Sequence, residues 1–192
     1  MLRAMSPIHP LPSLPTVLVL ASGRGERFAA SGGRVHKLQA LLGDKTVLQH
    51  TLAAVRASGL PWHLEDVGHP GMGDSIAAAV RATANAAGWL VLPGDLPLVQ
   101  AATLHQVAQA LQQNSVVVPV FQAPGGPRGH PVGFARSCRE ALLALKGNQG
   151  AAPVLRTFGA TELIVNDVGT VTDIDTLQDL ERASALWAMR QL

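Results

Sequence analysis

The sequence predicts an α/β domain in which helices cover both faces of a mostly parallel, twisted sheet. Continuous apolar runs at residues 16–21, 88–92 and 115–120 are typical of strands that are buried on both faces. Segments with the apolar spacing of helices separate these runs, and alternating strands and helices form parallel sheets. Apolar residues make up 47% of the 192 residues, which is enough for a large core. We therefore expect one three-layer α/β/α domain over residues 16–192.

The first half of the chain alternates between strands and helices. A loop rich in Gly, Ser and Arg, from Ser22 to His36, follows the first strand. We expect Thr46 to cap a helix with an apolar face and Gly59 to end it. A short strand at 62–67 precedes a second helix, which we expect to begin near Asp74.

The second half continues this alternation. We expect Thr103 to cap a helix that turns Leu104, Val107, Ala108 and Leu111 inward. Thr176 and Asp179 have the spacing of a capping box, which opens the last helix. The remaining expected elements are a short strand at 131–134, a helix near Cys138, and strands at 161–165 and 170–174.

Charge and aromatic content argue against a nucleic-acid partner. Lys plus Arg number 15 and Asp plus Glu 13, a formal charge of +2, and aromatic residues make up only 4%. Binding to a phosphate backbone needs clustered cations, and binding to single strands needs aromatic stacking surfaces. We expect neither kind of partner.

Nothing in the sequence predicts a membrane segment or an oxidising compartment. No apolar run approaches the roughly 20 residues that span a bilayer. Residues 1–15 are rich in Pro and lack the apolar stretch of a signal peptide, so we expect a flexible tail. The single cysteine, Cys138, excludes an internal disulfide. We therefore expect a cytoplasmic protein.

The loop after the first strand has the composition of a phosphate-binding loop. Gly23 and Gly25 allow backbone N–H groups to approach an anion, and Arg27 and Lys37 add positive charge. The loop lacks the Gly-Lys-Ser/Thr of a Walker motif and the third glycine of a dinucleotide-binding motif. Taken alone, it fits a phosphate site and a flexible surface loop equally well.

A carboxylate follows a later strand at the same predicted edge of the sheet. Asp95 stands between Gly94 and Pro97, directly after the apolar run at 88–92. A carboxylate there could hold Mg²⁺ against phosphate oxygens, or it could cap a turn. Ligands bind at this edge in parallel α/β sheets, so the loop and Asp95 predict one shared site.

The order of these motifs resembles the nucleotidyltransferases that activate molybdenum cofactor, and in particular their cytidylyltransferase branch. The resemblance covers residues 16–181. It rests on Leu20-Ala21-x-Gly23-x-x-x-Arg27 followed by Lys37, on Gly94-Asp95-x-Pro97, on Arg128–Val132, on Gly147–Ala151 and on Asp173–Leu180. It implies a Rossmann-like nucleotide-diphospho-sugar transferase fold and a Mg²⁺-dependent enzyme. The implied reaction is attack of the terminal phosphate of molybdopterin on the α-phosphorus of CTP, with release of pyrophosphate.

The resemblance also implies a role for each matching residue. Arg27, Lys37 and Asp95 would be catalytic, and Asp95 would bind Mg²⁺ with Asp173 or Asp175. Gly129, His130 and Pro131 would face the acceptor. The nucleotide would be bound by Ala21, Ser22, Gly23, Arg24, Arg27, Lys37, Ser75, Gly94 and Asp95.

Departures from the family pattern keep alternatives open. Residues 28–36 intervene before Lys37, so Arg34 is an alternative phosphate contact. Ser22 stands where cytidylyl transfer usually has Ala, and Asn148 and Ala152 stand where the family has an acid and an Arg. The alternatives are guanylyl transfer to molybdopterin, cytidylyl transfer to another phosphorylated small molecule, and a non-catalytic chaperone that serves a molybdoenzyme.

The seven histidines show no zinc-binding spacing. His130 is the one that we assign to the site, on the resemblance and its position. For His69, in Gly68-His69-Pro70-Gly71, a role in a turn is the favoured interpretation.

Overall fold

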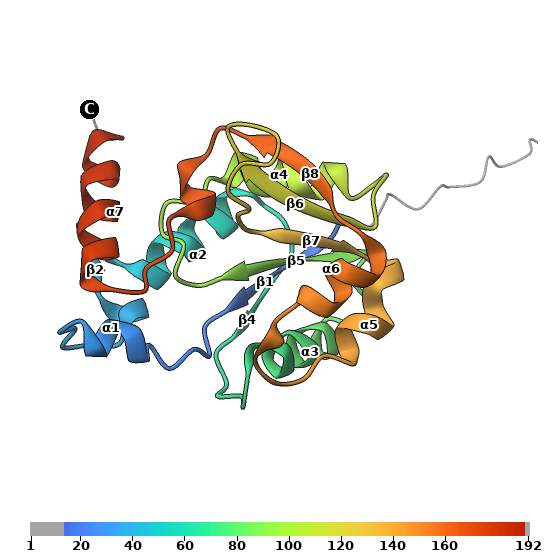
Figure 1. The fold of residues 1–192 in the computed structure, drawn as a ribbon, viewed down its shortest axis with the longest axis horizontal. Coiled ribbons are helices and arrows are strands. Elements are labelled where there is room, and N and C mark those ends of the chain that lie inside the picture. The colour runs from blue at the N-terminus through green and yellow to red at the C-terminus, as the bar shows by residue number, and fades with distance from the viewer. Residues whose placement is uncertain (1–13, 191–192) are drawn as a thin grey trace, which may run out of the picture.

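A six-stranded sheet runs through the centre of the domain, and β7 alone among its strands is antiparallel to its neighbours (Figure 1). The structure is a computed structural model, and it describes residues 14–190. Most of the predicted flexible tail therefore lies outside the described residues. The strands, in their spatial order, are β4 (Trp62–Glu65), β1 (Thr16–Leu20), β5 (Gly88–Pro93), β7 (Val132–Ala135), β6 (Val116–Phe121) and β8 (Thr161–Val165).

Helices cover both faces of the sheet, as the sequence predicts (Figure 1). One face packs on α2 (Val47–Ala57) and α4 (Ala101–Ala110), and the other on α3 (Met72–Ala82), α5 (Arg139–Leu143) and α6 (Ala152–Phe158). Strand β1 shows why its sequence is continuously apolar. Val17 and Val19 belong to one core cluster and Leu18 to the other, and all three are fully buried.

A third apolar cluster lies at one end of the sheet. It joins α1 (Glu26–Ala30), the hairpin of β2 (Leu41–Leu42) and β3 (Lys45–Thr46), and α7 (Leu177–Met189). Phe28 and Ile174 are buried in it. This cluster brings the end of the chain against the loop that follows β1. None of the helices within residues 14–190 has the length and apolar character required to cross a membrane.

Three of the predicted signals for helix ends are confirmed. Thr46 caps α2 and forms a complete capping box with Gln49, and Thr176 does the same for α7 with Asp179. Gly59 takes a φ of 65°, the left-handed conformation that suits glycine after a helix.

Three predicted elements are wrong. Residues 22–36 contain the short helix α1, because Gly25 (φ 66°) turns the chain and Phe28 is buried beneath it. Thr103 lies inside α4 and does not cap it; its hydroxyl donates to the Asp167 carboxylate over 2.8 Å. Residues 170–174 form no strand, because the Asp167 side chain holds a 3-10 turn at Val168–Val171.

Candidate active site

A cavity of about 430 Å³ lies beyond the carboxyl ends of β1 and β5. The chain passes from β1 to β4 on one side and then to β5 on the other, and such a reversal of strand order opens a crevice. Both predicted segments, the loop after β1 and the turn after β5, contribute to the walls. The lining residues are 20, 22–28, 37–38, 69–72, 75, 93, 95, 148 and 175.

The loop after β1 is closed by a histidine. The Nδ1 atom of His36 accepts from the Leu38 N–H over 3.3 Å, which leaves Nε2 to donate to the Gly23 carbonyl over 2.8 Å. A Cβ at Gly25 would lie 3.3 Å from this ring, so the glycine allows the close approach. The contact holds Lys37, the next residue, at the cavity. Sequence reasoning missed His36, because no local pattern indicates a partner 13 residues away.

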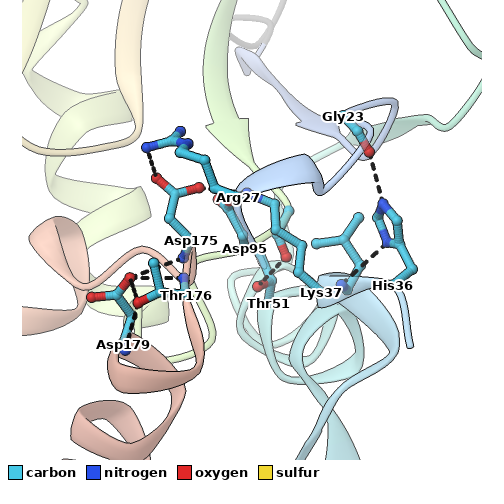
Figure 2. A network of polar contacts seen from close by, with 11 residues as sticks. Gly23, Arg27, His36, Lys37, Thr51, Asp95, Asp175, Thr176 and Asp179 are labelled. Carbon is cyan, nitrogen blue, oxygen red and sulfur yellow. Dashed lines mark hydrogen bonds and ion pairs between the residues drawn. The ribbon is translucent and has the colours of Figure 1, made fainter. Parts of the chain in front are cut away.

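An ion network at the cavity wall joins residues from three distant parts of the chain (Figure 2). Lys37 Nζ lies 2.5 Å from Asp95 Oδ2 and 2.9 Å from Asp175 Oδ1. Arg27 Nη1 lies 2.6 Å from the other oxygen of Asp175. The structure therefore brings together Arg27, Lys37 and Asp95, the three predicted catalytic residues, with Asp175, one of the two aspartates that the resemblance assigns to Mg²⁺ beside Asp95.

Backbone contacts fix both carboxylates of this network. The N–H of Ile174 donates to the Asp95 carbonyl over 3.0 Å, which ties the segment before α7 to the turn after β5. Asp175 immediately precedes Thr176, the capped start of α7 (Figure 2). The predicted alternative partner, Asp173, is more exposed than Asp175 and does not line the cavity.

The contacts in this network shift the pKa values of Lys37, Asp175 and Asp173. Burial lowers the pKa of Lys37, but the adjacent Asp95 and Asp175 outweigh it, and the net shift is upward. Burial raises the pKa of Asp175, but Lys37 and Arg27 bring it below its ordinary value. Burial and the charges of Asp175 and Asp95 raise the pKa of Asp173. Lys37 and Asp175 therefore form a charged pair at neutral pH.

The predicted metal ligands are near one another but not arranged as a metal site. Within residues 14–190, no group of three or more His, Cys, Asp or Glu side chains could hold a metal ion in this conformation. The Lys37 ammonium group lies between the carboxylates of Asp95 and Asp175. Asp95 Oδ1 is buried and has no hydrogen-bond partner among the described residues.

Neutral groups line the other part of the cavity. The hydroxyls of Ser22 and Ser75, both predicted nucleotide contacts, share a hydrogen bond of 2.7 Å. Asn148 lines this part of the cavity because its segment packs tightly on the start of α3. The Gly147 N–H donates to Asp74 over 2.8 Å, and a side chain at Gly71 would collide with the Gly147 carbonyl. One part of the cavity is thus ionic and the other is uncharged and polar.

The other predicted site residues lie at or beyond the edge of the cavity. Gly129, His130 and Pro131 are not among its lining residues. Burial lowers the pKa of His130, opposed by the charge of Asp95, and its Nδ1 is buried with no partner in the described part of the chain. His130 is therefore near Asp95 but outside the cavity.

Four more residues were predicted to bind the nucleotide or its phosphates, and they lie in different positions relative to the cavity. Ala21 and Gly94 act through their backbone, which links β1 to its neighbours: Ala21 N–H donates to the Glu65 carbonyl, and Gly94 N–H to that of Leu20, both over 2.8 Å. Arg24 lines the cavity, whereas Arg34 is exposed and does not.

Thr51 supports the turn that carries Asp95. It is fully buried on α2, and its hydroxyl donates to the Gly94 carbonyl over 3.0 Å. Its position, one turn after Val47 on the apolar face of the predicted helix, is a signal that could have found it.

We expect Thr51→Val to destabilise the fold by about 1–3 kcal/mol, because it preserves the side-chain shape but leaves the buried Gly94 carbonyl without its donor. Urea denaturation measures this change in the free energy of unfolding. Thr51→Ser, which retains the hydroxyl, is the control. Equal stability of Thr51→Val and the wild type would contradict the supporting role.

A buried glutamate lies behind the uncharged part of the cavity. Glu65 ends β4 and is 6% exposed. His69 Nε2 lies 3.0 Å from one of its carboxylate oxygens and His63 Nε2 3.3 Å from the other. Burial raises the pKa of Glu65, but these two histidines outweigh it and bring the pKa below the ordinary value of 4.5. His69, placed in a turn by the sequence, also lines the cavity.

The lowered pKa of Glu65 makes stability depend on pH. A carboxyl whose pKa is lower in the folded state stabilises the fold above its unfolded pKa, and that contribution is lost as pH falls through the folded pKa. We expect Glu65→Gln to cost about 1–3 kcal/mol at neutral pH. The difference from the wild type should narrow as pH falls below 4.5. Thermal unfolding at a series of pH values tests this, and a difference that is constant with pH would contradict it.

Comparison with protein families gives a match over the central part of the chain. Residues 52–163 match the family model of the MobA-like NTP transferase domain, which is more than half of the 192 residues. The matched segment includes Ser75, Asp95 and residues 129–131. The loop after β1 and the segment before α7 lie outside it.

Solved structures share the fold. Rv0371c from Mycobacterium tuberculosis H37Rv superposes with a TM-score of 0.74 at 23% identity, covering 90% of this chain and 99% of that one. The 2-C-methyl-D-erythritol 4-phosphate cytidylyltransferase from Thermus thermophilus gives a TM-score of 0.64 at 22% identity, covering 91% and 99%. These likenesses confirm the predicted fold class.

Curated relatives are longer proteins. The bifunctional protein GlmU from Coxiella burnetii (strain CbuG_Q212) is 27% identical over 144 residues, which are 65% of this chain and 30% of GlmU. This chain therefore spans less than a third of the length of this relative.

Proposed function

We propose that this chain, which belongs to the family of MobA-like NTP transferase domains, transfers CMP from CTP to the terminal phosphate of a molybdopterin-type acceptor. Membership of the family supports nucleotidyl transfer as the reaction and a nucleoside triphosphate as the substrate class. The observation that carries the choice of site is the meeting of Arg27, Lys37, Asp95 and Asp175 at one cavity wall. We also propose that the protein is cytoplasmic and that its product is delivered to a molybdoenzyme.

The two parts of the cavity suit the two parts of a nucleotide. Arg24, Arg27 and Lys37 would bind the triphosphate, because cations and the N–H groups of a glycine-rich loop neutralise polyphosphates. Ser22, Ser75 and Asn148 would surround the nucleoside with neutral hydrogen-bonding groups. Ala21, Gly23 and Gly94 would support this site through their backbone.

The proposed reaction needs positioning and charge neutralisation more than proton transfer. An oxygen of the acceptor phosphate bonds to the α-phosphorus of CTP, the bond from that phosphorus to the bridging oxygen of the β-phosphate breaks, and pyrophosphate leaves. The acceptor is already an anion, so no general base is required. Lys37 and Arg27 would stabilise the charge that develops on the pyrophosphate.

The carboxylates at the cavity wall are suitable ligands for a divalent cation. Carboxylate oxygens are the protein ligands that Mg²⁺ prefers, and Asp95 Oδ1 is buried without a partner among the described residues. Asp95 with Asp175 or Asp173 would hold the ion, once Lys37 turns from the carboxylates toward the phosphates. When bound, Mg²⁺ supplies charge neutralisation to the phosphate oxygens. Rv0371c, which shares the fold, has been solved in complex with manganese, and this supports a divalent cation.

The acceptor admits a second candidate. The Thermus thermophilus enzyme that shares the fold is, by its name, a cytidylyltransferase acting on a polyol phosphate. This supports CTP as donor and makes cytidylyl transfer to a sugar or polyol phosphate the second candidate. The molybdopterin acceptor rests on the resemblance of Gly129-His130-Pro131 to the acceptor motif of the molybdenum cofactor cytidylyltransferases.

Release of pyrophosphate tests the proposal directly. Each of the four nucleoside triphosphates is incubated with Mg²⁺ and with molybdenum cofactor, a sugar phosphate or a polyol phosphate. The expected result is turnover with CTP and molybdenum cofactor alone. Turnover with a different base or acceptor would select guanylyl transfer or the second candidate. Binding of CTP without any turnover would contradict the enzyme and favour a nucleotide-binding chaperone.

A further inference from the structure

The imidazole of His69 lies in the uncharged part of the cavity, with a carboxylate fixed behind it. Its side chain is 20% exposed and lines the cavity together with Ser22, Ser75 and Asn148. Glu65 is anchored by its own backbone, since its carbonyl accepts from the Ala21 N–H over 2.8 Å between β4 and β1. The sheet thus determines where the carboxylate lies, and the carboxylate determines where the ring lies.

The contact with Glu65 also determines which ring nitrogen of His69 carries hydrogen. His69 Nε2 lies 3.0 Å from Glu65 Oε1, and an ionised carboxylate can only accept. In the neutral ring, Nε2 therefore carries the hydrogen and Nδ1 retains a lone pair. Within residues 14–190, Glu65 is the only hydrogen-bond partner of the His69 side chain, so Nδ1 is available to a ligand.

We propose that His69 is a specificity-determining residue, whose Nδ1 accepts a hydrogen bond from the exocyclic amino group of the nucleotide base. Glu65 is then a positioning residue that holds the accepting tautomer. This inference rests on the proposed function, because it assumes that the nucleoside occupies the uncharged part of the cavity.

The chemistry selects bases by the group that they present. Cytosine carries an exocyclic amine at C4 and adenine carries one at C6, and either amine can donate to Nδ1. Uracil and guanine carry a carbonyl oxygen at the corresponding position, and this would face the lone pair of Nδ1 without a hydrogen between them. A site built to accept from an amine discriminates strongly against an analogue without it, because the polar groups of both partners are left unpaired. CTP and UTP differ in this group, so the ratio of their dissociation constants is the most direct measure of the proposed hydrogen bond.

A matched pair of histidines provides the control. His63 contacts the same carboxylate as His69, over 3.3 Å, but does not line the cavity. His63→Leu and His69→Leu each remove one hydrogen bond from Glu65, and only the second removes an acceptor from the cavity. Glu65→Gln retains the shape but can donate to the ring, which permits the opposite tautomer.

The experiment measures dissociation constants for CTP and UTP by isothermal titration calorimetry. We expect the wild type and His63→Leu to prefer CTP by about tenfold or more, as one well-formed hydrogen bond provides. In His69→Leu and Glu65→Gln the preference should fall to about twofold or less. Thermal unfolding of all variants verifies that each is folded.

The results distinguish failure of the specificity role of His69 from failure of the proposed function. An unchanged CTP preference in folded His69→Leu would overturn the specificity role and leave the proposed function intact. Loss of the preference in His63→Leu as well would also overturn it, because the effect would then come from the carboxylate network. Failure of the wild type to bind any nucleoside triphosphate would overturn the proposed function and the inference together.

Discussion

Asp95→Asn is expected to reduce pyrophosphate release by about 1000-fold or more, because it removes the carboxylate that pairs with Lys37 and that we propose as a ligand of the divalent cation. Asn has the same shape, and the backbone carbonyl of residue 95 still accepts from the Ile174 N–H. Lys37 also keeps its contact with Asp175, at 2.9 Å. The fold should therefore survive while the proposed cation site is lost.

Two controls make this result interpretable. Asp44→Asn is the same chemical change at an exposed turn that does not line the cavity, and its turnover should equal that of the wild type. Circular dichroism and thermal unfolding should show that Asp95→Asn is folded. Rates within a few-fold of the wild type for Asp95→Asn would contradict the assignment of this carboxylate.

Lys37→Met is the second substitution with a large expected effect, because it removes the cation that lies between Asp95 and Asp175 and leaves Arg27 as the only ion-pair partner of Asp175 among the described residues. The side chains of Lys37 and Asp95 are each 13% exposed, and that of Asp175 is 16% exposed. Removal of one partner of a largely buried ion pair costs about 3–5 kcal/mol, and Met retains the apolar volume but not the charge. Loss of a cation that stabilises the transferring phosphates should lower turnover by about 100-fold or more.

Chemical denaturation and pyrophosphate release measure the two effects of Lys37→Met separately. Lys45→Met, at an exposed position in β3, is the matched control and should change neither. Asp175→Asn in the Lys37→Met background should recover part of the lost stability, because it removes one of the opposed charges. Wild-type stability and turnover in Lys37→Met would contradict the network as the centre of the site.

Much of the candidate site could be predicted from the sequence, because the rule for parallel sheets is a geometric one. Strands that are buried on both faces reveal themselves by continuous apolar runs, and their carboxyl ends meet at one edge. This was sufficient to expect the loop of Arg27 and Lys37 beside Asp95, and the contact of Lys37 with Asp95 confirms that this loop and the turn after β5 meet. The roles of these residues in catalysis remain predictions.

The sequence by itself determined what depends on neighbours along the chain. The strand at Thr16–Leu20, the capping boxes of Thr46 and Thr176 and the stop at Gly59 all follow from side-chain period or from hydrogen bonds within a few residues. These are short-range interactions, so their signals are written locally.

Only the tertiary structure decided which distant groups meet. Asp175 rather than Asp173 faces Lys37 across 138 residues, because the core cluster of Phe28 and Ile174 presses the end of the chain against the loop after β1. The contacts of His36 with Gly23 and of His69 with Glu65 could not be predicted from the sequence either. Such contacts arise from how packed elements come together, and an acid or a histidine in the sequence carries no local mark of the partner that packing will bring to it.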